Sequence, residues 1–314
     1  MKAEMVNRAF MGGLLICAAV ATSLARVEGN ADADTNRTDT NRTDTNSADA
    51  KNDAVAIVTE MRGTAEVQSE KSVVKASVLT EFLSGARVDL QAGAKLVVLY
   101  LTSGDQYELT GPALVQFGDH APASTSGTAP LKLRSMVGKD GTPIRIRPAA
   151  LTQPGIAARK ALGKPIPALS VASTITLERL PVFRWKAVER GLEYKFVLKD
   201  RGGSALFSQT VKGDFLELPE QVALQDGESY VWSIGTRSGM GQNYLSEYSF
   251  KTADEATRAA VENYRPAGDA PVAERVAFAV WLDQMELRDA GTVQWKSIAD
   301  AGSQIPEGRL APPK

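Results

Sequence analysis

The chain has 314 residues, a formal net charge of −1 and a pI near 6.1. This length allows two small domains with a helical appendage, because domains commonly span roughly 100–150 residues. The near-zero charge provides no overall basic field that could hold a polyphosphate, so we expect no nucleic-acid partner.

Residues 1–25 have the pattern of a signal peptide. Lys2 and Arg8 come before an apolar run, and small residues follow where a signal peptidase would cut, after Ala21 or after Ala25. The apolar run is short for a membrane span. We therefore predict a protein exported to the periplasm, with an uncleaved N-terminal anchor as the alternative.

The one cysteine, Cys17, lies inside this apolar run. Lipidation of Cys17 would be another route to the membrane, but Ile16 stands where lipoprotein signals carry a small residue. Removal of the signal beyond Cys17 would leave no thiol. The mature chain would then have no disulfide, no cysteine nucleophile and no thiolate metal site.

Residues 26–53 form a polar segment of low complexity. No aromatic or large aliphatic residue occurs from position 30 to position 52, and the pattern DTNRT at residues 34–38 is repeated at 39–43. Such a segment cannot bury enough apolar surface to offset the entropy lost on ordering. We predict a disordered tether.

Residues 54–120 alternate short apolar segments with glycine-containing turns, which indicates a small β domain. The run LVVLYL at residues 96–101 is too short for a comfortable helix and rich in strand-forming residues. We expect it to be a strand buried on both faces. A turn at residues 102–105 and the alternating residues 106–109 then predict a hairpin.

The spacing of glycines and aliphatic residues in this domain resembles the FecR-type domain of bacterial envelope proteins. The residues that carry the resemblance are Gly63, Val67, Leu79, Phe82, Gly85, Val88, Gly93, residues 96–101, Ser103, Gly104, Tyr107, Leu109 and Gly111. The resemblance implies a small periplasmic β-barrel-like roll with glycines at its corners. Members of the family sense signals and control a sigma factor through a cytoplasmic N-terminal segment, and only about eight residues come before the apolar run here.

Residues 121–164 are rich in Pro, Gly, Ser, Thr and Ala, and we expect a linker. Residues 165–252 then hold several short strands at regular spacing, which favours a β-sandwich. The pattern PVFRW at residues 181–185, followed by Tyr194, LQDG at 224–227 and YVW at 230–232, resembles a fibronectin type III-like domain. Such domains often follow a FecR-type domain.

Two sets of residues in this second domain are candidates for recognition. Trp185 and Trp232 could form a platform for sugar rings, but their alternating strand positions favour the sandwich core. The loop at residues 235–243 is the better candidate, because it is rich in glycine and in side chains that hydrogen-bond. The side chains that we expect to bind a partner are Arg237, Ser238, Gln242 and Asn243.

The C-terminal residues 253–300 favour helices, followed by a flexible tail at 301–314. We expect one helix over residues 253–264, and a second capped by Asp269 and ended by Gly291. A third contains Trp295. The pattern is similar to a tetratricopeptide-type hairpin, whose apolar face either packs on the sandwich or binds a partner.

No strong catalytic or metal-binding motif occurs in the sequence. His120 is the single histidine and has no second imidazole or mature thiol to share a metal, so we expect an ordinary loop residue. We predict no catalytic, cofactor-binding or metal-binding residues and no cofactor. The expected fold is mainly β, with a β-barrel-like or meander FecR-type domain, a fibronectin type III-like sandwich and a short helical hairpin.

These expectations together indicate a non-enzymatic binding or adaptor protein of the cell envelope. Its partner would be a protein or a glycan. One alternative is a periplasmic signal sensor or regulator of the FecR type. The other is a glycan hydrolase that uses a pair of carboxylic acids.

Overall fold

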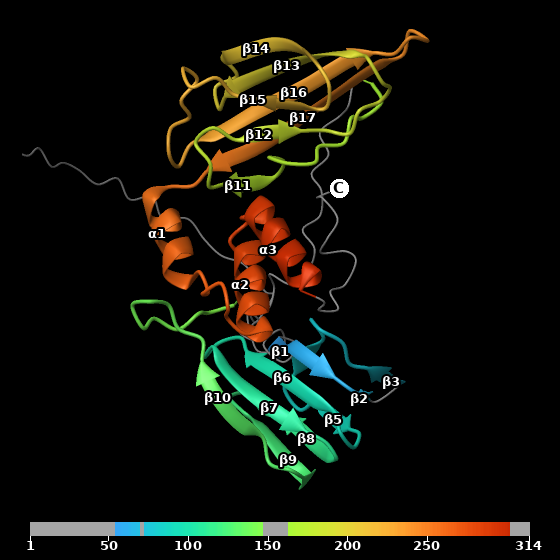
Figure 1. Cartoon of the computed structure of the whole chain (residues 1–314), viewed down its shortest axis with the longest axis vertical. Coiled ribbons are helices and arrows are strands. Elements are labelled where there is room, and N and C mark those ends of the chain that lie inside the picture. The colour runs from blue at the N-terminus through green and yellow to red at the C-terminus, as the bar shows by residue number, and fades with distance from the viewer. Residues whose placement is uncertain (1–53, 70–71, 147–162, 302–314) are drawn as a thin grey trace, which may run out of the picture. The chain divides into compact units, whose positions relative to one another are not determined.

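Strands dominate the computed structural model, which describes residues 54–69, 72–146 and 163–301. Within these residues the strands form three five-stranded sheets and one two-stranded sheet, and three helices follow them (Figure 1). The mainly β fold with a helical C-terminal segment is thus confirmed. The predicted signal peptide, Cys17, the tether and the predicted tail from residue 302 onward lie outside the described residues.

The first β region, residues 54–146, consists of two five-stranded sheets. Their strand orders are β10-β7-β6-β1-β4 and β3-β2-β5-β8-β9, and every paired neighbour is antiparallel. The strands are β1 (Ala54–Arg62), β2 (Ala65–Ser69), β3 (Ser72–Lys75), β4 (Glu81–Leu83), β5 (Arg87–Leu90), β6 (Lys95–Tyr100), β7 (Asp105–Thr110), β8 (Ala113–Phe117), β9 (Pro122–Gly127) and β10 (Leu131–Ser135).

The two sheets of this region enclose one apolar core. Phe82 of β4 and Phe117 of β8 stack with their ring centroids 4.1 Å apart, which joins the two sheets. Strand β6 is buried on both faces, as its apolar run predicts. One face lies in this core, and Leu99 on the other face lies in a second core that includes the helices. Gly63 and Gly111 mark close approaches of the chain. A Cβ on Gly63 would lie 2.9 Å from the Ala94 Cα, and one on Gly111 would lie 2.0 Å from the Gln91 carbonyl oxygen.

The expected linker from residue 121 is partly wrong, because its first part belongs to this β region. Strand β9 pairs with β8 and strand β10 pairs with β7. Ile144 and Ile146 are buried, and the Ile146 N–H donates to the Leu101 carbonyl over 2.9 Å. The turn-forming residues of β9 do not predict a strand. As an edge strand that covers the core on one side only, β9 needs few apolar side chains.

The β-sandwich, residues 163–252, places a five-stranded sheet of order β11-β17-β16-β13-β14 with the two-stranded sheet β12-β15. Strand β11 runs parallel to β17, and the other pairs are antiparallel. The strands are β11 (Thr174–Thr176), β12 (Val182–Arg184), β13 (Glu193–Asp200), β14 (Ala205–Lys212), β15 (Phe215–Glu217), β16 (Ser229–Arg237) and β17 (Asn243–Thr252).

Aromatic side chains fill the sandwich core. Trp185 and Trp232 are fully buried, so the prediction that they are core residues is confirmed and the sugar platform is excluded. Phe183, Phe196 and Trp232 contact one another through their rings, with Phe183 and Phe196 centroids 4.9 Å apart. Residues at alternate positions of each strand point inward, which is why the pattern was readable from the sequence.

The C-terminal segment forms three helices, and the second is buried on every side. They are α1 (Glu255–Tyr264), α2 (Val272–Gln284) and α3 (Arg288–Asp300). Every residue from position 276 to position 282 of α2 is buried. These residues share a core with α3, with Ile57 and Leu99 of the first β region, and with the partly buried Ile175 of the sandwich. The helices thus pack on the sandwich, which was one of the two expected alternatives, and also on the first β region.

Two predicted helix boundaries are wrong. Pro271, not Asp269, occupies the N-cap position of α2, and it makes no side-chain capping bond. Helix α2 ends at Gln284, and Gly291 lies inside α3. A Cβ on Gly291 would come 2.4 Å from the Asp283 Oδ1, so this glycine allows the two helices to approach closely and does not end either of them.

Hydrogen bonds join the start of the sandwich to the α2–α3 turn and to the first residues of α3. The Thr174 hydroxyl donates to the Glu286 carbonyl and accepts from the Arg288 N–H, each over 3.0 Å. The Val171 N–H donates to the Asp289 carboxylate over 2.9 Å. Burial raises the pKa of Asp289, although this hydrogen bond acts in the opposite direction. Val171 itself has a positive φ of 54°, a strained conformation for a β-branched residue.

Candidate functional site

One end of the sandwich brings together three connections. They are the β12–β13 loop, the β14–β15 turn and the β16–β17 hairpin. Tyr194, at the start of β13, is buried beneath them, and its hydroxyl accepts from the Val188 N–H over 2.8 Å. The backbone N–H of Trp185 donates to the Asp214 carbonyl over 2.9 Å. Two aromatic core residues are therefore hydrogen-bonded to the β12–β13 loop and to the β14–β15 turn.

The predicted recognition residues lie on the β16–β17 hairpin, but its loop is shorter than expected. Strand β16 continues through Gly235 to Arg237, so the loop spans residues 238–242. Ser238 is buried and belongs to the turn, because its hydroxyl accepts from the Gln242 N–H over 3.2 Å. Ser238 therefore stabilises the turn. The prediction that it contacts a partner is wrong.

The other three predicted residues are exposed. The Arg237 Nε donates to the Gly241 carbonyl over 3.2 Å, so the guanidinium folds back along the hairpin. The backbone carbonyl of Asn243, the first residue of β17, accepts from the Lys164 N–H over 3.3 Å. At the tip, Met240 is 94% exposed, the most exposed of the large hydrophobic residues that the structure describes.

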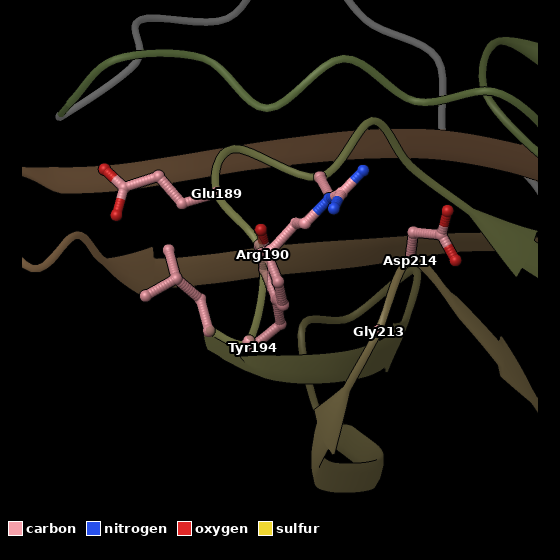
Figure 2. A pocket seen from close by; sticks show the side chains of 8 residues that line it. Glu189, Arg190, Tyr194, Gly213 and Asp214 are labelled. Atoms are coloured by element: carbon pink, nitrogen blue, oxygen red, sulfur yellow. The ribbon is translucent and has the colours of Figure 1, made fainter.

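The hairpin contacts the neighbouring loop through one hydrogen bond. The Gly239 N–H donates to the Glu189 carboxylate, 3.4 Å away. Glu189 also lines a small pocket together with Arg190, Tyr194 and Asp214. Figure 2 shows the Glu189 and Asp214 carboxylates at opposite ends of the view, with the Arg190 side chain between them. The structure thus places the predicted hairpin next to a pocket that the sequence did not reveal.

The size and exposure of this pocket limit what it can do. Its volume is about 200 Å³, which is below the roughly 300–1,000 Å³ of sites for drug-sized ligands. It fits a single side chain or one sugar ring. Glu189, Arg190 and Asp214 are all exposed, so a ligand could meet both signs of charge there. The sequence signal for this loop was the charged pair at positions 189 and 190 followed by Gly191.

A second, larger cavity lies where strands β1 and β3 meet the start of α2. Its volume is about 600 Å³, within the range of small-molecule sites. Glu60 and Arg62 form an ion pair over 3.5 Å at its wall, and Lys75 adds another cation. Val272 and Val276 of α2 supply an apolar side. None of these residues belongs to a sequence motif that predicts a site.

The single histidine is not part of either cavity. His120 is exposed in the connection between β8 and β9, beside the exposed Asp119. In the described part of the chain, no group of three His, Asp or Glu side chains is arranged to hold a metal ion. Within residues 54–69, 72–146 and 163–301, no helix has the length and apolar character needed to cross a bilayer.

Comparisons with known proteins leave the family open. No family model matches the sequence, and no curated protein matches it. Among solved structures, the chain is similar to CopC from Methylosinus trichosporium OB3b, with 18% identity, a TM-score of 0.23, and 29% of this chain and 95% of that chain covered. It is also similar to a structure described in connection with host cell surface retention of a 1.5-MDa bacterial ice-binding adhesin. There the identity is 12%, the TM-score 0.20, and 63% of this chain and 55% of that chain are covered. Such low scores support no argument about function, and the FecR-type and fibronectin type III-like resemblances stay predictions.

Proposed function

We propose that this chain is an exported binding or adaptor protein of the cell envelope that recognises a protein or a glycan at the loop end of its sandwich. The observation that carries the proposal is the hydrogen bond between Gly239 and Glu189, which joins the predicted recognition hairpin to the pocket. Export is inferred from the N-terminal signal pattern. The FecR-type resemblance of residues 54–120 is to periplasmic modules, which agrees with export.

The chemistry of this end suits recognition better than catalysis. Glu189 and Asp214 are both exposed, whereas paired-acid hydrolysis uses two carboxyl groups that flank the scissile bond of a bound sugar. Arg190, Arg237 and Met240 add exposed cationic and apolar groups to the same end. Arginine and methionine are enriched at protein interfaces. We infer that a partner is held by these side chains and not transformed.

The test is capture of a partner from crosslinked bacterial envelopes. Arg190→Ala and Met240→Ala should each reduce the captured partner at least about five-fold, since a few central residues dominate interface energy. The matched control is Arg201→Ala. Arg201 is also exposed, but it lies in the β13–β14 turn, at the far end of the strand that begins next to the pocket. Equal loss with Arg201→Ala, or turnover of a glycan by the purified chain, would overturn the proposal.

A second function, that of a signal sensor, is favoured by the cavity between the first β region and α2. A small ligand there would touch both the ion pair of Glu60 and Arg62 and the apolar side chain of Val276. Val276 belongs to the core that α2 shares with the sandwich residue Ile175, so a bound ligand could alter that packing. Screening of anionic small molecules by thermal shift tests this function. Stabilisation that Lys75→Ala abolishes would support it, and no stabilisation by any compound would count against it.

A further inference from the structure

The open edge of the sandwich sheet is the longest unprotected strand edge among the described residues. Strand β14 ends the five-stranded sheet and pairs only with β13. Its eight residues, ALFSQTVK, contain no proline and no charge before Lys212. Lys212 already forms an ion pair with Glu193 of β13, 3.4 Å away. An edge strand of this kind offers a row of unpaired N–H and C=O groups to another strand.

Among the described residues, the other edges of the five-stranded sheets are protected in ways that β14 is not. Strand β10 carries Lys132 and Arg134, and β9 begins with Pro122. Strands β3 and β4 have only four and three residues. Strand β11, at the opposite edge of the same sheet, is three residues long and its Ile175 N–H donates to the Glu286 carbonyl over 2.8 Å. Charges, proline, short length and cover by another element are the usual means of blocking edge pairing.

The sequence of β14 is suited to pairing with itself. In an antiparallel two-fold arrangement with Gln209 opposite Gln209 of the second copy, Phe207 would lie opposite Val211. Both are half-buried at the rim of the sandwich core, so a further strand would complete their cover. Aromatic and β-branched residues are favourable cross-strand partners. No like charges meet in this register, because Lys212 would lie opposite Leu206.

We propose that β14 is a self-association surface, through which two copies of this chain join their sandwich sheets edge to edge by antiparallel β14–β14 pairing. This proposal is independent of the loop end of the sandwich. The pairing is isologous, so it closes after two copies and does not form a filament through this edge. A contact made by one strand pair is small compared with stable interfaces, which bury about 1,200–2,000 Å². The dimer should therefore depend on concentration.

The first experiment measures the mass of the full chain by sedimentation equilibrium from low micromolar to submillimolar concentration. The expected result is a mass that rises toward twice that of the monomer. Gln209→Lys places two ammonium groups opposite each other in the dimer, and should raise the dissociation constant at least about ten-fold. Gln209 is exposed in the single chain, so the variant should fold, which thermal melting checks. The matched control is Ser249→Lys, an exposed position of the interior strand β17, which should change the constant less than about two-fold.

A cysteine crosslink tests the register. In a Cys17→Ser background, Gln209→Cys places two thiols directly opposite each other, about 4.5–5.5 Å apart at Cβ, and mild oxidation should link the copies. Ser208→Cys, which would face Thr210, should link far less. A mass that stays monomeric at every concentration overturns the proposal. So does a dimer that neither responds to Gln209→Lys nor crosslinks at position 209, or a monomer whose β14 edge binds an extended peptide of another protein.

Discussion

The two edge strands of the sandwich sheet differ in their surroundings. Another element of the chain covers the edge of β11, whereas the edge of β14 is open to solvent. At the β11 edge, the Thr174 hydroxyl and the Ile175 N–H bond to the turn between α2 and α3. At the β14 edge, Leu206 is 45% exposed and Gln209 also faces solvent. The covered edge links the sandwich to the helices, whereas the open edge is free to make contacts outside the chain. Both edges belong to one sheet. Whether an edge is covered therefore depends on which element lies next to its strand.

The largest effect is expected where the core supports the covered edge. Trp232 is fully buried, and its Nε1–H donates to the Val171 carbonyl, 2.6 Å away, just before β11. Trp232→Ala should lower the free energy of unfolding by about 3–5 kcal/mol. Phe207→Ala, at the open edge, should lower it by at most about 2 kcal/mol because Phe207 is only half-buried. Urea denaturation measures both. Similar losses at the two sites would contradict the comparison.

The same substitution at the two edges sharpens the comparison. Thr174→Val removes a buried hydroxyl that both donates and accepts, leaving the Arg288 N–H without that acceptor. We expect a loss of about 1–3 kcal/mol. Thr210→Val changes an exposed hydroxyl of β14 and should stay within about 0.5 kcal/mol. The free energies of unfolding of the two variants, measured side by side, check this expectation, and it is wrong if they match.

A smaller effect concerns the pH dependence of the covered edge. Burial raises the pKa of Asp289 in the folded chain. The folded state then holds its proton more tightly than the unfolded state. This contributes stability below the unfolded pKa that is lost as pH rises through the folded pKa. Asp289→Asn cannot ionise but keeps an oxygen for the Val171 N–H. Between about pH 4 and pH 8 it should therefore lose less stability than the natural chain.

The control for this pH effect is Asp289→Ala, which removes the acceptor as well as the charge. It should be less stable than Asp289→Asn at every pH, because the Val171 N–H is left without this acceptor. Unfolding measured at several pH values separates the two variants. If Asp289→Asn follows the same pH dependence as the natural chain, the buried carboxyl is not its source.

The smallest effect on stability is expected at the hairpin tip. Met240 is 94% exposed, so Met240→Ala should change the free energy of unfolding by no more than about 0.5 kcal/mol. The same variant should reduce partner capture, which would separate recognition from folding. A large loss of stability would instead show that the methionine packs against the described structure.

The sequence by itself determined the apolar strands in the cores of the first β region and of the sandwich. Inward-facing residues recur at alternate strand positions, which assigns Trp185 and Trp232 to a core from the sequence alone. The short continuous apolar run at residues 96–101 likewise predicts a strand that is buried on both faces. Three helices were also predicted, the first from its helix-forming residues and the second from the helical spacing of its apolar residues, although two of the boundaries were wrong. These are local patterns, and local patterns can be read along the chain.

The tertiary structure alone decided what each edge and each glycine does. Gly291 looked like a helix end but serves a close approach to Asp283, which is distant from it until α2 and α3 pack. Ser238 looked like a contact residue but is buried in its own turn. Whether β11 or β14 is covered depends on where the α2–α3 turn lies, and no periodicity within either strand reports the position of a segment distant in sequence.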